Sequence, residues 1–93
     1  MKYFDWDESK NSKLKVERDI GFEDVLTAID EGRVLDDIMH PNNRRYPRQR
    51  VLVIACRKYV YLIPFVEDET KIFLKTIIPS RKVTKQYLQG DMP

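Results

Sequence analysis

Residues 50–78 hold three apolar segments separated only by short polar turns, and this run narrows the possible folds more than any other feature. Residues 50–56 are apolar on both faces, which is typical of a strand in the middle of a sheet. Residues 59–66 are rich in aromatic and β-branched side chains, and residues 71–78 follow after a charged turn. Residues 71–78 are predicted to form the third strand, so Lys75 is displayed by the sheet and not by a loop. The sequence therefore predicts three consecutive, mostly antiparallel strands.

Two amphipathic helices are predicted before this sheet. Asp7 can cap a helix over Glu8–Arg18, because its carboxylate can accept the free amide hydrogens of the first turn. A second helix, over residues 22–31, carries an apolar stripe at helical spacing, formed by Phe22, Val25, Leu26 and Ile29. Gly32 supplies the left-handed residue that commonly ends a helix.

The remaining segments complete an α+β fold. Residues 33–39 are expected to form a short edge strand, and Ser80 can cap a last helix over residues 81–89. The predicted fold class is α+β, with two N-terminal helices packed on a mostly antiparallel sheet of three or four strands and a short C-terminal helix. The sheet face opposite the two helices, with the basic loop of residues 40–48 and the last helix at its rim, is the expected working surface.

Length and composition limit the class of protein. The chain of 93 residues is expected to form a single domain, and 42% hydrophobic residues suffice for one core. No apolar run is long enough to span a membrane, and residues 1–7 lack the apolar region of a secretion signal. The single cysteine, Cys56, is expected to be a buried apolar residue in a reducing cytoplasm. One histidine and one cysteine do not make a zinc site, so no metal or cofactor is predicted.

The charges are distributed unevenly although the net charge is only +2. Residues 39–58 contain six cations and no carboxylate, whereas residues 1–37 contain eleven carboxylates and six cations. A concentrated cationic surface on a small domain most often binds phosphate groups or an acidic protein. Alternating arginine and aromatic side chains suit single-stranded RNA, and the candidate RNA-binding residues here are Arg44, Arg45, Tyr46, Arg48 and Arg50. The alternatives are a solvated loop, or one that is held by acidic residues of the second helix.

Three stretches, taken together, resemble the BrnT-type ribonuclease toxins of bacterial type II toxin–antitoxin pairs. They are Phe4-Asp5-Trp6-Asp7 followed by Lys10 and Asn11, then Ile20-Gly21-Phe22-Glu23, and then Ile77-Ile78-Pro79-Ser80-Arg81-Lys82-Val83-Thr84. The resemblance covers most of the chain in order and spacing. It implies a RelE-like domain that cleaves RNA without a metal and is inhibited by a ribbon–helix–helix-like antitoxin. Operator DNA would be reached only through that antitoxin, and no membrane is involved.

Metal-free RNA cleavage needs a base, an acid and cations that stabilise the charge developing on the phosphate. Arg81 is the strongest candidate for phosphate binding because a guanidinium can hold two oxygens, and Lys82 beside it is a candidate RNA contact. Lys75 can bind phosphate or transfer a proton, or else pair with Glu69 or Asp68. Tyr87 and His40 complete the candidate catalytic set; Tyr87 can equally dock the last helix, and His40 can simply be solvated.

The sequence also departs from the family pattern. Thr76 stands where the family usually has an arginine, Arg18 replaces a histidine, and Tyr87 replaces a glutamate. These departures favour a second hypothesis, a non-catalytic RNA-binding or protein-interaction module of the same fold. A third hypothesis is a structural subunit whose oppositely charged halves pair head to tail or with a partner.

Overall fold

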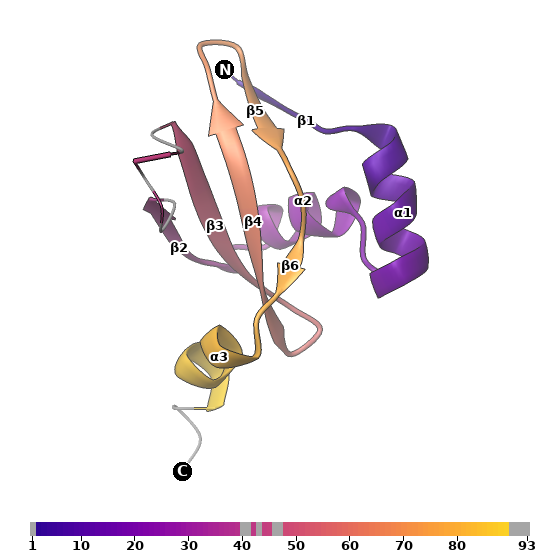
Figure 1. The fold of residues 1–93 in the computed structure, drawn as a ribbon. Helices are drawn as coiled ribbons and strands as arrows, with labels where there is room; N and C mark the ends of the chain where they lie inside the picture. Colours follow the sequence, from indigo (N-terminus) through magenta and orange to yellow (C-terminus); the bar gives the residue numbers. More distant parts are fainter. Residues whose placement is uncertain (1, 40–41, 43, 46–47, 90–93) are drawn as a thin grey trace.

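A computed structural model describes residues 2–39, 42, 44–45 and 48–89 (Figure 1). The helices are α1 (Glu8–Arg18), α2 (Phe22–Asp30) and α3 (Arg81–Thr84), the last continued by the π-helical turn η1 (Lys85–Gln89). The strands are β1 (Tyr3–Asp5), β2 (Val34–Met39), β3 (Gln49–Cys56), β4 (Tyr59–Glu67), β5 (Lys71–Leu74) and β6 (Ile78–Pro79). The predicted α+β class is confirmed.

The strands form one mixed sheet that is larger than predicted. Its order is β1-β5-β4-β3-β2, and β6 pairs with β4. Neighbouring strands are antiparallel except β1, which lies parallel to β5 with Tyr3 opposite Lys71. The sequence prediction missed β1, because three residues are too few to show a period of two. The predicted edge strand is confirmed as β2.

The prediction of one continuous strand over residues 71–78 is wrong. β5 ends at Leu74 and β6 begins at Ile78. Leu74 pairs with Phe65, whereas Ile78 pairs with Leu62, so the chain holds one extra residue between the two pairs. This irregularity brings Ile77, like Leu74, into the core, although three residues of regular strand would have placed them on opposite faces. Lys75 consequently follows the strand and does not belong to it, although its amide donates to the Pro64 carbonyl (2.8 Å).

The main core lies between the two N-terminal helices and one face of the sheet. Its buried members on the helices and the turn between them are Leu14, Ile20, Phe22, Val25 and Ala28, and those on the sheet side are Ile54, Cys56, Ile63, Phe65, Leu74 and Ile77. The opposite face was expected to be the open working surface. At its centre it is buried and apolar instead, since Val51, Val53 and Val60 are at most 4% exposed. Cationic side chains therefore gather at the ends of the sheet rather than across this face.

Local capping follows the sequence closely. Asp7 accepts hydrogen bonds from the amides of Ser9 (2.8 Å) and Lys10 (3.2 Å), which confirms the predicted start of α1. Gly32 has a φ of +74° just after α2, which confirms the prediction that a left-handed residue ends this helix. Ser80 accepts a hydrogen bond from the Val83 amide (3.2 Å) at the start of α3. These three signals depend on neighbouring residues alone, which is why they could be recognised before the fold was known.

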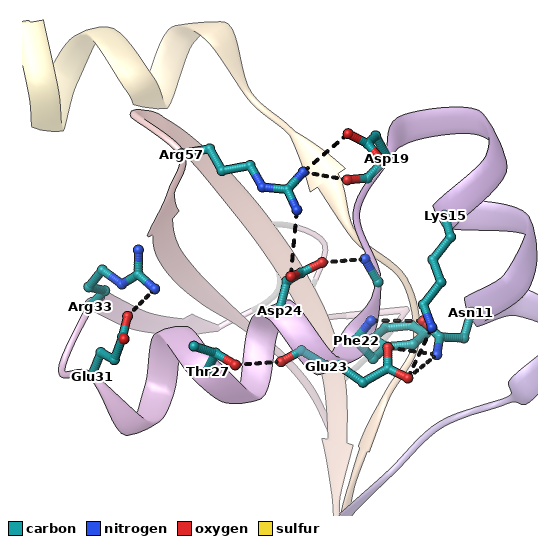
Figure 2. A network of polar contacts seen from close by, with 11 residues as sticks. Asn11, Lys15, Asp19, Phe22, Glu23, Asp24, Thr27, Glu31, Arg33 and Arg57 are labelled. Carbon is teal, nitrogen blue, oxygen red and sulfur yellow. Dashed lines mark hydrogen bonds and ion pairs between the residues drawn. The ribbon is translucent and has the colours of Figure 1, made fainter.

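A buried amide joins α1 to α2 (Figure 2). Asn11 is 1% exposed, and its Oδ1 accepts the Phe22 amide hydrogen (2.8 Å) while its Nδ2 donates to both carboxylate oxygens of Glu23. These hydrogen bonds, Asn11 first among them, hold the pKa of Glu23 below its usual value. Gly21 is required by close approach, because a Cβ there would lie 2.9 Å from Asn11 Oδ1 and closer still to Lys15 and Glu23. The polar contacts thus fix how the two helices meet.

The β3–β4 turn is strained. Arg57 and Lys58 have φ values of 54° and 64°, and they connect the paired residues Cys56 and Tyr59. Such two-residue turns usually contain asparagine or glycine, because other side chains are disfavoured in the left-handed region. Arg57 is held in place by Asp19 and Asp24, whose carboxylate oxygens lie 3.5 and 3.6 Å from its guanidinium (Figure 2). Lys58 is exposed and has no ion pair among the described residues.

Replacing Lys58 with glycine is expected to stabilise the fold. Relief of the left-handed strain outweighs the greater entropy of glycine in the unfolded chain, so we expect a gain of about 0.5–1 kcal/mol. Thermal unfolding should then shift upward by roughly 2–8 °C. Lys58→Ala is the matched control, because it removes the same charge and keeps the strain. An equal melting temperature for the two variants would show that the turn conformation is not the source of the gain.

Candidate nucleic-acid interface

The predicted basic loop is only partly described, and two of its described arginines, Arg48 and Arg50, lie near carboxylates. His40 and Tyr46 fall outside the described residues. Arg50 forms ion pairs with Asp37 (2.8 Å) and, more loosely, with Glu67 (3.9 Å), and its guanidinium lies over the Phe65 ring. Arg48 and Arg50 line an open hollow, whose other lining residues are Lys2, Glu67, Asp68 and Glu69. Arg44 is exposed, and Arg45 has its own contacts. Arg50, at the start of β3, is therefore paired with carboxylates of β2 and β4.

A different group of cations lies at the opposite end of the molecule. The β3–β4 turn and α3 occupy the lower end in Figure 1, whereas the acidic β4–β5 turn is at the top. Two hydrogen bonds hold α3 there: Ser80 donates its amide hydrogen to the Val60 carbonyl (3.0 Å), and Thr84 Oγ1 accepts the Val60 amide hydrogen (2.9 Å). We call this surface the basic end; its residues are Lys58, Arg81, Lys82 and Lys85.

The cations of the basic end are available for a ligand. All four are exposed, and none forms an ion pair with any described residue. Arg81 and Lys85 are four residues apart on one helical segment and so share a face. Like charges on a shared face repel each other unless an anion lies between them. The arrangement suits a phosphate-bearing ligand.

Lys75 lies at some distance from Arg81. The Lys75 amide bonds to Pro64 and the Ser80 amide to Val60, so the two backbone segments are four β4 residues apart, or about 13 Å. Lys75 is exposed and pairs with neither Asp68 nor Glu69, the partners considered from sequence. The Asp68 carboxylate instead accepts the amide hydrogens of Thr70 and Lys71, which lower its pKa. Lys75 and Arg81 can therefore contact different phosphates of one strand.

Tyr87 has a docking contact. Its hydroxyl donates a hydrogen bond to Asp36 Oδ2 on β2 (3.2 Å), and this bond is the main reason why the pKa of Tyr87 is raised. The contact ties η1 to the edge strand. This contact fits the docking role that the sequence offered for Tyr87 as the alternative to catalysis.

Sequence reasoning missed two cations beside these residues. Arg18 at the end of α1 donates a hydrogen bond to the Ile77 carbonyl, between Lys75 and Arg81 in the chain. Lys58 belongs to the basic end because it lies in the β3–β4 turn. Arg18 could have been chosen as a candidate from the sequence, because it stands at the position of a histidine in the family pattern. Lys58 could have been chosen because it lies with Arg57 between two predicted strands, where a two-residue turn exposes both side chains.

The remaining polar clusters have structural roles. The network of Figure 2 joins α1, α2 and the β3–β4 turn, and it contains the Asp24 carboxylate, which accepts the Gly21 amide hydrogen (2.8 Å). Cys56 is buried and unbonded, as expected for an apolar role. Among the residues that the structure describes, no three histidine, cysteine, aspartate or glutamate side chains gather as metal ligands.

Comparisons of the chain with known protein families, with characterised proteins and with solved structures found no match. In the described ranges, no helix has the length and apolar character needed to cross a membrane.

Proposed function

We propose that this chain is the toxin of a bacterial type II toxin–antitoxin pair, acting in the cytoplasm as an endoribonuclease that holds RNA at the basic end. The observation that carries the proposal is the group of four exposed cations without ion pairs among the described residues. Single-stranded RNA places a negative charge on every nucleotide, so such a group binds it by releasing counterions. The resemblance of the motifs supplies the reaction and the antitoxin partner.

Arg81 and Lys75 have distinct proposed roles. Arg81 binds the phosphate at which cleavage occurs, because its planar guanidinium can hold two phosphate oxygens. The 2′-hydroxyl passes its proton to a base and its oxygen attacks this phosphorus. The bond to the 5′-oxygen breaks and that oxygen takes up a proton from an acid, while Arg81 stabilises the charge that develops. Lys75 binds another phosphate of the same strand, because its backbone lies about 13 Å from that of Ser80 along β4.

The test is incubation of purified protein with single-stranded RNA in the presence of a chelator. Cleavage by the wild type is expected, with a rate lowered by about 100-fold in Arg81→Ala, as for loss of one transition-state donor. Lys75→Ala is expected to weaken RNA binding more than cleavage at saturation. Lys71→Ala is a suitable control, because Lys71 is paired with Asp5 (3.5 Å). Full activity in both Arg81→Ala and Lys75→Ala would reject the proposed site.

The Tyr87 contact favours a second candidate, an RNA-binding module without catalysis. The bond to Asp36 engages the hydroxyl that would otherwise be free to transfer a proton. RNA binding with a steep salt dependence, but with no cleavage in either the wild type or Tyr87→Phe, would identify this function. The expected effect of Tyr87→Phe on binding alone is small.

A further inference from the structure

A second cationic surface lies on α1. A hollow of about 120 Å³ is lined by Lys10, Lys13, Leu14, Glu17 and Arg18. Three cations and one carboxylate leave the hollow with a net positive charge. These residues recur at helical spacing, so they belong to one side of α1. Neither the predicted basic loop nor the basic end includes any of them.

The side chains of the hollow are not neutralised by one another. Lys13 precedes Glu17 by four residues, a spacing at which ion pairs form on helices, and yet the described residues contain no such pair. Lys10 also lacks an ion pair within this part of the chain. Arg18 is fixed by its bond to the Ile77 carbonyl, which uses one of five guanidinium donors and leaves the others for a ligand.

Arg18 links the hollow to the segment that leads into the basic end. Arg18 is anchored at Ile77, and four residues of chain, at most about 14 Å, separate Ile77 from Arg81. In the other direction, Lys10 lies eight residues along α1 from Arg18, or about 12 Å. Figure 1 shows the end of α1 beside β6, which leads directly into α3. The cations therefore follow a path from α3 along α1.

We infer that the α1 hollow is a second phosphate subsite for the RNA strand, which runs from the basic end along α1. The inference rests on the proposed function and adds to it the direction of the strand and the length of RNA that is bound. A path of at most about 26 Å corresponds to no more than roughly eight nucleotides at the 3.4 Å spacing of a stacked strand. A trinucleotide is too short to cover this path and can occupy only one end of it.

The experiment measures the binding of a 12-nucleotide RNA and a trinucleotide over a range of salt concentrations. The variant Lys10→Gln/Lys13→Gln removes two cations from the hollow. Its control, Lys2→Gln/Lys15→Gln, removes two cations that pair with Glu67 and Glu23 and do not line the hollow. Both variants have the same net charge, so they separate a local contact from a general electrostatic effect.

For the 12-nucleotide RNA, the hollow variant is expected to reduce the salt slope by about 1.4 and the affinity by about 25-fold near 0.1 M salt, whereas the control changes little. Trinucleotide binding should be unchanged in both. An equal loss in the two variants would overturn the subsite and leave the proposed function standing. RNA that fails to bind the wild type would overturn both. If inorganic phosphate shifts the NMR signals of Lys13 and Arg18 but RNA does not displace it, the hollow is a free-phosphate site and the inference is wrong.

Discussion

Asn11→Ala is expected to lower the free energy of unfolding by about 3 kcal/mol and the melting temperature by roughly 12–24 °C. Asn11 is almost fully buried and satisfies the Phe22 amide, which has no other cap because Gly21 offers no side chain. Its loss leaves a buried donor unpaired and removes two hydrogen bonds to a carboxylate. The measurement is thermal or urea unfolding followed by circular dichroism.

A second measurement on Asn11→Ala tests whether the loss of stability comes from the missing hydrogen bonds of Asn11. Hydrogen bonding from Asn11 is the largest contribution that lowers the pKa of Glu23, so an NMR titration of Asn11→Ala should show this pKa rising toward its usual value. Glu23→Gln is the control, because glutamine retains an acceptor for Asn11 and the Glu23 side chain is 54% exposed. We expect that control to change stability by less than about 1 kcal/mol. Wild-type stability in Asn11→Ala would contradict a capping role for the buried amide.

Removing two charges from the basic end is expected to weaken RNA binding by about 25-fold near 0.1 M salt, with a salt slope shallower by about 1.4. The variant is Lys82→Ala/Lys85→Ala, which leaves the proposed catalytic Arg81 in place. Both side chains are exposed and lack ion pairs among the described residues, so their charge is available to a phosphate. Fluorescence anisotropy of a labelled RNA at several salt concentrations gives both quantities.

The matched control for the basic end is Arg48→Ala/Arg50→Ala in the predicted basic loop. Arg50 is paired with Asp37, and the hollow that both arginines line contains three carboxylates, so binding should fall by less than about threefold. A larger loss in this control than in Lys82→Ala/Lys85→Ala would return the RNA site to the loop. It would also contradict the assignment of the basic end.

The elements that sequence predicted well are those stabilised by near neighbours. The cap at Asp7, the stop at Gly32 and the start of α3 at Ser80 each depend on residues within one helical turn. β3 and β4 were equally clear, because long β-branched segments leave few alternatives. The break between Leu74 and Ile78 was not predicted, since it follows from the need to bury Ile77 against helices that lie far away in the sequence.

In the candidate site, too, the chemical types of the residues were predicted from the sequence, whereas their long-range contacts were not. Sequence identified Arg81, Lys82 and Lys75 as phosphate-binding candidates, and the structure leaves all three exposed and without ion pairs in its described part. The sequence could not show that Arg50 faces Asp37 and Glu67, because these partners come from two other strands. Nor could it bring Arg18 to Ile77, a contact that spans 59 positions. Charge counts along a chain do not reveal which charges meet.

By itself, the sequence determined the α+β class, the helix ends, the principal strands and the chemical types of the candidate residues. These follow from local hydrogen bonding and from the periodicity of apolar side chains. Only the tertiary structure decided which cations are neutralised and which remain available, because ion pairs join strands and helices that are distant in sequence. Lys58, Arg81, Lys82 and Lys85 remain without ion pairs to any described residue at the end formed by α3 and the β3–β4 turn, although Asp19 and Asp24 pair with Arg57 of that turn and Asp36 accepts a hydrogen bond from Tyr87.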